Sequence, residues 1–124
     1  MMELTLDNSD SQYQIRGYQP GTLRINDMTF HQSVILTPRQ LHHPWPPQDF
    51  EHLMAANFDL LLSLQPEIVI IGTGEQMRFC SPAWLMPFYT KKIGVECMTT
   101  AAACRTFNVL AAEGRNVAAG LIIL

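Results

Sequence analysis

The sequence has few charged residues, and its basic residues are not gathered in any one stretch. Charged side chains make up 15% of the 124 residues, against about 25% in an average domain. The net charge is −3, and Lys91-Lys92 is the only adjacent pair among the eight Lys and Arg residues. A nucleic-acid binder needs a concentrated basic face, so we expect no nucleic-acid partner. The thinly charged surface leaves room for a protein partner or for self-association.

The sequence also lacks a long apolar run. No run approaches the roughly 18 residues that a membrane-spanning helix needs. The start of the chain has neither the basic segment nor the long apolar segment of a secretory signal. We therefore expect no direct membrane insertion and a cytoplasmic location.

The sequence has few cysteines, and their spacing matches no common disulfide or metal-binding motif. The three cysteines, Cys80, Cys97 and Cys104, are an odd number without a C-x-x-C pattern, which indicates reduced thiols in a cytoplasmic protein. A nucleophilic cysteine would need a base and an orienting group, and no Cys-His signature is present. Cys104 is expected beside Phe107 and Ala111 on a helix, so we interpret it as an inert buried thiol.

Length and apolar content favour one folded domain. Hydrophobic residues make up 48% of the chain, and a chain of this size buries about two-thirds of its unfolded surface. No internal repeat or low-complexity tract marks a second unit. We therefore expect residues 1–124 to form a single domain.

The first third of the chain has the pattern of an antiparallel meander with one wet face. Turn residues at Pro20-Gly21 and Asn26-Asp27 separate segments in which apolar and polar residues alternate. The polar residues 1–12 are expected to form a loose end. Strands are predicted at residues 14–18, 22–25 and 28–36.

A stiff connection and a helical pattern follow. Residues 38–47 hold four of the eight prolines, which predicts a rigid segment with a short edge strand near residues 40–43. Apolar residues then recur with helical period over residues 50–62, with Asp49 at the N-cap position. In an alternative interpretation, Asn57 begins a second, shorter helix.

The second half alternates strands and helices. Four consecutive aliphatic residues, at positions 68–71, predict a strand over residues 67–71 that is buried on both faces and ends at a glycine turn. Further strands are expected at residues 93–98 and 117–124, the last of them central or nearly so. Between them, a helix over residues 101–113 begins after Thr99-Thr100 and ends before Gly114.

The segment between the glycine turn and the second of these strands is less regular. Ser81-Pro82 offers a helix start, but Pro87 would interrupt any long helix there, so we expect a short helix or an irregular crossover. With the antiparallel first third, these elements predict a mixed sheet in an α/β or α+β domain.

Two turns are expected to meet at one edge of the sheet. The carboxyl ends of parallel strands lie together, so Gly72-Thr73-Gly74 and Thr99-Thr100 should be neighbours. Backbone N–H groups at such turns favour an anion, to which the three threonine hydroxyls could also donate. Alternatively, the glycines only permit a tight turn and the threonines only cap a helix. Met77 stands where a dinucleotide fingerprint has its third glycine, and no Gly-Lys-Ser/Thr follows, so neither phosphate motif is complete.

Aromatic residues among prolines suggest a second type of site. Trp45, Trp84 and Phe88 are interpreted as loop anchors or, together, as an exposed aromatic patch for a partner. The adjacent histidines His42-His43 would point to opposite faces of a strand and cannot easily share a metal ion. We therefore expect no metal, no cofactor and no catalytic residue.

Four segments in combination resemble a known family. They are Ile68–Gly74, Ile93–Thr100, Ala103–Leu110 and Glu113–Ala119. The resemblance is to the small domain shared by archaeal and bacterial proteins of unknown function, by the mitochondrial assembly factor for the alpha subcomplex of respiratory complex I, and by the adipogenesis-associated protein of animals. It covers nearly the whole chain and implies a three-layer β+α/β/α fold around a mixed, mainly parallel sheet, without established catalytic residues.

The expected function follows from low charge, the aromatic segment and this resemblance. We expect a non-catalytic protein that binds a partner or assists assembly, and that could be dimeric. The alternative is a small-molecule or anion-binding protein, conceivably an enzyme, with its site at Gly72-Thr73-Gly74 and Thr99-Thr100.

Overall fold

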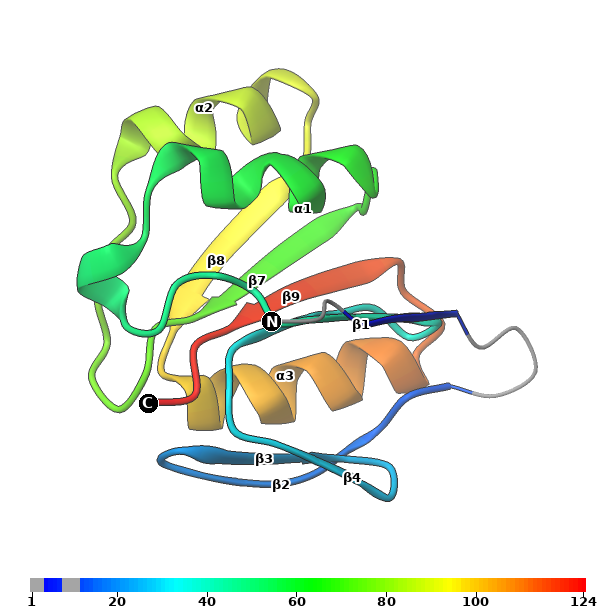
Figure 1. The fold of residues 1–124 in the computed structure, drawn as a ribbon. Helices are drawn as coiled ribbons and strands as arrows, with labels where there is room; N and C mark the ends of the chain where they lie inside the picture. The colour runs from blue at the N-terminus through cyan, green and yellow to red at the C-terminus, as the bar shows by residue number, and fades with distance from the viewer. Residues whose placement is uncertain (1–3, 8–11) are drawn as a thin grey trace.

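The computed structural model describes residues 4–7 and 12–124, which fold in layers around a six-stranded sheet (Figure 1). Helices α1 and α2 lie on one side of this sheet, and α3 lies on the other side with a separate three-stranded sheet. The strands of the central sheet, in spatial order, are β1 (Leu4–Asp7), β6 (Gln40–His43), β5 (Val34–Leu36), β9 (Val117–Leu121), β7 (Ile68–Gly72) and β8 (Gly94–Met98).

The small sheet is the expected antiparallel meander. It consists of β2 (Ile15–Gln19), β3 (Thr22–Ile25) and β4 (Met28–Phe30). The helical segments are two 3₁₀ turns, η1 (Phe50–His52) and η2 (Ala55–Phe58), and the helices α1 (Asp59–Ser63), α2 (Pro82–Thr90) and α3 (Thr100–Ala112). The predicted fold class, a mixed α/β domain with three layers, is confirmed.

The central sheet is more antiparallel than expected. β7 pairs in parallel with β8 and β9, whereas β5 pairs antiparallel with β9 and with β6, and β6 pairs antiparallel with β1. The difference arises because the chain leaves the meander and contributes β5 to the central sheet. The strand β6, expected at an edge, is covered by β1, so residues 4–7 are not the loose end that we predicted; most of the remainder of residues 1–12 lies outside the described residues.

The single strand predicted at residues 28–36 is wrong, because it is interrupted at residues 31–33. Ser33 is buried there and bonds to the proline-rich segment instead of to a strand. Its carbonyl oxygen accepts a hydrogen bond from the Trp45 N–H at 2.7 Å, and its hydroxyl donates to the Pro47 carbonyl at 2.7 Å. These bonds direct the chain from one sheet to the other.

The continuous helix predicted at residues 50–62 is also broken. Asp49 caps η1 as predicted, because its side chain accepts from the His52 N–H at 3.0 Å. Leu53 and Met54 are then extended, and the Asn57 side chain accepts from the Met54 N–H at 2.8 Å, which starts a second turn. The alternative interpretation, in which the region of Asn57 begins a separate element, is therefore closer to the structure.

The later elements follow the prediction more closely. The helix α2 begins at Pro82, and Pro87 lies inside it without ending it. The Thr99 hydroxyl caps α3 by accepting from the Ala102 N–H, and Gly114 has a φ of +77° just beyond its end. Within the described residues, no helix has the length and apolar character needed to cross a membrane.

The two central strands are buried on both faces, so the molecule has two cores. In β7, Ile70 packs under α3 and the small sheet, whereas Val69 and Ile71 face the layer of α1 and α2. In β9, Ala119 faces the layer of α3 and the small sheet, and Ala118 faces the layer of α1 and α2. Both cores share one sheet, and we infer that the described residues form one domain.

The contact between Trp45 and Gly120 gives a first test of this packing. A Cβ atom at Gly120 in β9 would lie 2.7 Å from the buried Trp45 ring, whose N–H is held by the Asn57 carbonyl at 3.0 Å. We expect Gly120→Ala to lower the free energy of unfolding by about 1–3 kcal/mol, because the ring cannot move away freely. Urea denaturation measures this loss.

Gly17→Ala is the matched control, since no atom lies within 4 Å of a Cβ placed at Gly17 in β2. It should change the stability by no more than about 0.5 kcal/mol. Equal effects of the two substitutions would contradict the proposed role of the Trp45 contact.

Candidate functional site

The glycine turn after β7 and the start of α3 lie side by side, as predicted. The Thr73 N–H donates to the Met98 carbonyl at 2.8 Å, and the Thr100 N–H donates to the Gly74 carbonyl at 2.9 Å. The five residues predicted for ligand binding are thus brought together at one edge of the central sheet.

Their hydroxyl groups bond to the protein itself. Thr100 is 0% exposed; its hydroxyl oxygen accepts from the Gly74 N–H at 2.8 Å, and its O–H donates to the Ile122 carbonyl. The Thr73 hydroxyl donates to the Gln76 carbonyl at 2.6 Å. The Thr100 side chain therefore connects the end of β7, the start of α3 and the residue that follows β9.

The two glycines are required by close packing at this connection. A Cβ atom at Gly72 would lie 2.9 Å from the Thr100 hydroxyl oxygen and 3.1 Å from the Leu121 side chain. Gly74 has a φ of +100°, and a Cβ there would lie 2.7 Å from the Leu124 carbonyl oxygen. These contacts support the interpretation as a tight turn and a helix cap, while ligand binding at the same residues stays a prediction.

One polar group beside this connection is buried without a hydrogen bond to the described residues, the Tyr18 hydroxyl. Burial raises the pKa of this phenol, and the nearby Glu75 carboxylate and Cys104 thiol raise it further. Tyr18 contributes to a shallow hollow of about 230 Å³, which Ala101 and Arg105 on the first turns of α3 also line.

The aromatic residues predicted as an exposed patch are mostly buried. Trp45 is 4% exposed and Phe88 is 0% exposed, because both pack against the central sheet in the core under α1 and α2. Trp84 is half-buried, with its ring centroid 5.6 Å from that of Phe58 and 6.4 Å from that of Phe50. The prediction of an exposed patch from these three residues is therefore wrong for Trp45 and Phe88, which stabilise the core.

Other apolar side chains are exposed on the layer that contains α2, and the sequence analysis missed them. We call this set the α2 surface; Phe79 is its most exposed member, at 83%. The sequence signal is a pair of apolar residues, Met77 and Phe79, in the segment between the glycine turn and α2. The α2 surface consists of Met54, Met77, Phe79, Met86 and Tyr89.

Arg78 holds the segment that carries Met77 and Phe79. Its guanidinium bonds to the Glu51 carboxylate at 2.8 Å and lies 5.5 Å from the centroid of the Phe50 ring. These contacts connect the segment between Met77 and Phe79 to η1.

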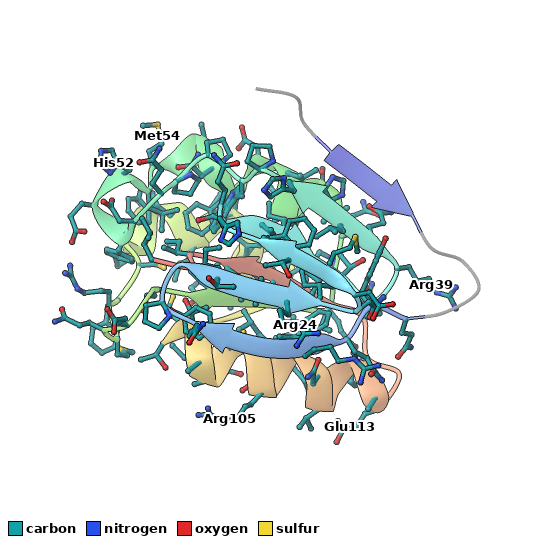
Figure 2. All side chains as sticks on the ribbon, turned by 60° about the horizontal axis from the view of Figure 1, so that its bottom comes forward. Arg24, Arg39, His52, Met54, Arg105 and Glu113 are labelled. Atoms are coloured by element: carbon teal, nitrogen blue, oxygen red, sulfur yellow. The ribbon has the colours of Figure 1, made fainter. Side chains whose placement is uncertain are left out.

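Three arginines lie at separate places on the molecule. Figure 2 shows Arg24 on β3, Arg39 before β6 and Arg105 on α3, with His52 and Met54 on another side. The absence of a nucleic-acid partner stays a prediction.

The histidines bond to different neighbours. His52 Nδ1 lies 2.6 Å from the Asp49 carboxylate, whereas the His43 ring packs 4.9 Å from that of Phe30, and burial lowers the pKa of His43. Among residues 4–7 and 12–124, no three His, Cys, Asp or Glu side chains come together to form a metal site.

The cysteines lie in two environments. Cys104 is buried in the core under α3, where burial raises the pKa of its thiol to about 12, in line with an inert thiol. Cys80 and Cys97 lie in the other core, and their sulfur atoms are 2.8 Å apart. The sequence does not indicate this proximity, because the two cysteines are 17 positions apart.

A pocket of about 360 Å³ lies beside Trp45, between the proline-rich segment and the residues after β9. Three prolines, Pro44, Pro46 and Pro47, line it with Trp45, and His31, which also lines it, has Nδ1 3.2 Å from the Gly21 carbonyl. No pair of charged groups converges there among the described residues. We assign it no chemistry.

Comparisons with known proteins cover nearly the whole chain. A family model described as "Protein of unknown function (DUF498/DUF598)" matches residues 15–122. Among solved structures, a protein from Bordetella parapertussis is similar with a TM-score of 0.87 and 29% identity, over 94% of this chain and 99% of that one.

Two curated relatives have names of different kinds. The chain is 28% identical to the "13 kDa major membrane protein" of Francisella tularensis, over 98% of this chain and 100% of that protein. It is 36% identical to the NADH dehydrogenase (ubiquinone) 1 alpha subcomplex assembly factor 3 of Drosophila melanogaster, over 87% of this chain and 57% of that protein. The match therefore spans little more than half of the assembly factor.

The buried Thr100 hydroxyl gives a test of the connection between the strands and α3. We expect Thr100→Val to lower the free energy of unfolding by about 1–3 kcal/mol, because the Gly74 N–H and the Ile122 carbonyl lose their partner. Thr100→Ser, which keeps the hydroxyl, should cost less. Urea denaturation compares the two variants.

Thr90→Val makes the same chemical change at an exposed position near the end of α2 and should be close to neutral. If Thr100→Val were as mild as Thr90→Val, the hydroxyl would not hold this connection.

Proposed function

We propose that this chain, which belongs to the DUF498/DUF598 family of proteins of unknown function, is a non-catalytic protein that binds a protein partner in the manner of an assembly factor. The observation that carries the proposal is the α2 surface, where apolar side chains are exposed on a well-packed layer. The name of the Drosophila relative supports it, although that name describes a protein of which this chain matches only part.

The exposure of Phe79 needs an explanation in terms of binding. Burying a phenylalanine side chain contributes about 1.5–3 kcal/mol, and this one is left almost entirely in water. Several exposed apolar side chains on one layer are a candidate interaction site, whereas a single one is not. Methionine and aromatic residues, the types present here, are enriched in protein interfaces.

The neighbouring contacts support a preformed surface. Arg78 fixes the position of the segment before α2 through Glu51 and Phe50, and Trp84 packs on Phe50 and Phe58 beneath it. Binding to a fixed surface loses little conformational freedom, which favours affinity. The partner that fits is a polypeptide with an apolar segment, because the α2 surface offers mainly apolar contacts.

The helix α3, on the other side of the central sheet, does not carry a comparable set of exposed apolar residues among the described residues. Val109, 56% exposed, is the large apolar residue that α3 leaves in water among the described residues. A single exposed side chain of this kind is normal for a protein surface. Val109 therefore serves as a matched control for substitutions on the α2 surface.

The test is affinity purification of the tagged chain from its native cells. We expect it to recover a stoichiometric protein partner from the cytosolic fraction, in keeping with the proposed cytoplasmic location. The double substitution Phe79→Ser and Met86→Ser should weaken binding by about 2 kcal/mol, roughly thirtyfold in Kd, without lowering the Tm.

Val109→Ser should leave the partner bound. Recovery of no partner from any fraction, together with a strictly monomeric state in analytical ultracentrifugation, would overturn the proposal. Self-association through the α2 surface would instead appear as a dimer that the double substitution dissociates. A chain recovered only with membranes would contradict the proposed location.

A second candidate function is anion binding beside the start of α3, and the Tyr18 hydroxyl favours it. This buried donor lacks a partner among the described residues, and Arg105 lines the same hollow. Leaving a buried hydroxyl without a hydrogen bond costs about 1–3 kcal/mol, which a bound anion would recover. The Thr99-Thr100 helix start adjoins this hollow through Ala101.

Inorganic phosphate is the probe for this second function. We expect millimolar phosphate to raise the Tm of the wild-type chain, and Tyr18→Phe to abolish the rise without reducing the Tm measured in its absence. Thr90→Val, which alters a hydroxyl on another layer, should keep the rise. A chain whose Tm is insensitive to phosphate, or equally sensitive after Tyr18→Phe, has no such site.

A further inference from the structure

Two thiols from distant parts of the sequence meet in the core under α2. Cys80 lies in the segment just before α2, and Cys97 lies in β8, with 2.8 Å between their sulfur atoms. A disulfide bond has an S–S length of about 2.05 Å, so the sulfur atoms need to approach by less than about 1 Å to form one. The fold therefore already holds the two thiols close to bonding distance.

The two thiols are not equivalent. Cys97 is half-buried, whereas Cys80 is buried. The hydrogen bond between the two sulfur atoms lowers the pKa of Cys97, while the same interaction and burial raise the pKa of Cys80. The accessible thiol of the pair is thus also the one that ionises more easily, as attack on a disulfide requires.

The third cysteine is kept apart from this pair. Cys104 belongs to the core on the opposite face of the central sheet, with Ile70 and Phe107. The strands β7 and β9 separate the two cores, so Cys104 cannot reach Cys97 while the sheet is intact. An intramolecular bond between Cys80 and Cys97 therefore has no competitor in the folded chain.

We propose that Cys80 and Cys97 are a modification site at which a small-molecule disulfide is exchanged for a reversible disulfide bond between strand β8 and the segment before α2. This assignment does not depend on the proposed function. Its link to the α2 surface is that Phe79 directly precedes Cys80, so the bond would tie the most exposed residue of that surface to the central sheet.

The reaction takes place in two exchanges. The Cys97 thiolate attacks one sulfur of the small-molecule disulfide, its S–S bond breaks, and one thiol leaves after taking up a proton. Cys80 then loses its proton and attacks the Cys97 sulfur, which displaces the second small thiol. The two cysteines are oxidised, and the small-molecule disulfide is reduced to two thiols.

The bond would also restrain the unfolded chain. It closes a loop that contains all of α2, and such a cross-link reduces the conformational freedom of the unfolded state. We therefore expect oxidation to raise the Tm and a dithiol reductant to reverse the rise.

The experiment uses the full chain, first reduced and then equilibrated with oxidised and reduced glutathione at several ratios. After quenching and alkylation under denaturing conditions, intact mass counts the free thiols, and a peptide map locates the bond. We expect the number of alkylated thiols to fall from three in the reduced chain to one in the oxidised chain, with Cys104 as the remaining thiol.

Three variants separate the steps. Cys80→Ala should stop at a mixed disulfide between Cys97 and one glutathione, Cys97→Ala should form no bond at Cys80, and Cys104→Ala, the control, should form the bond normally. In the wild-type chain, Cys97 should react with a thiol reagent at least about tenfold faster than Cys104.

The peptide map of the unsubstituted chain decides the question even if a variant does not fold. Three alkylated thiols at every glutathione ratio, a bond that includes Cys104, or a bond between two chains would each overturn the proposal. Because none of these measurements involves a partner, their failure is distinct from a failure to recover one by affinity purification.

Discussion

The strands β7 and β9 carry no polar side chain, and both of their faces must therefore be kept from water. This constraint accounts for the layers around them. On one side, α3 and the three-stranded sheet supply the cover, and on the other side α1, α2 and the 3₁₀ turns do so. The Thr100 hydroxyl connects the start of α3 to the residues that follow β7 and β9. The stability of the fold depends on the cover that these layers give to both faces of β7 and β9.

Local patterns predicted the elements that depend on local chemistry. Runs of aliphatic residues identified β7 and β9, and Thr99 and Gly114 marked the ends of α3, because burial and capping are visible in a short stretch of sequence. Features that depend on distant residues were not predictable in this way. The break at Ser33 comes from bonds to the proline-rich segment, and the burial of Trp45 comes from its contact with β9.

The candidate sites also combine features that local sequence predicts with features that depend on distant residues. The sequence identified the glycine turn and the start of α3 as neighbours, since parallel strands end at one edge, but it did not show that their donors bond to protein groups. It also drew attention to tryptophans that support the core, whereas no local pattern distinguishes Phe79 from a buried aromatic residue. A binding surface is defined by what the fold leaves uncovered, and that is known only when the layers are in place. The family relationship adds names of relatives but no catalytic residue.

The place of β9 in the sheet has a consequence for how the chain is made. β9 follows both β5 and β7 in the sequence, yet it lies between them and joins two halves of the sheet that have no other pairing with each other among the described strands. Until it leaves the ribosome, β5 and β7 each expose an unpaired apolar edge, a template for pairing with other chains. The nascent chain therefore exposes these two edges until β9 has been synthesised and pairs with both of them, and other chains can associate with it during that interval.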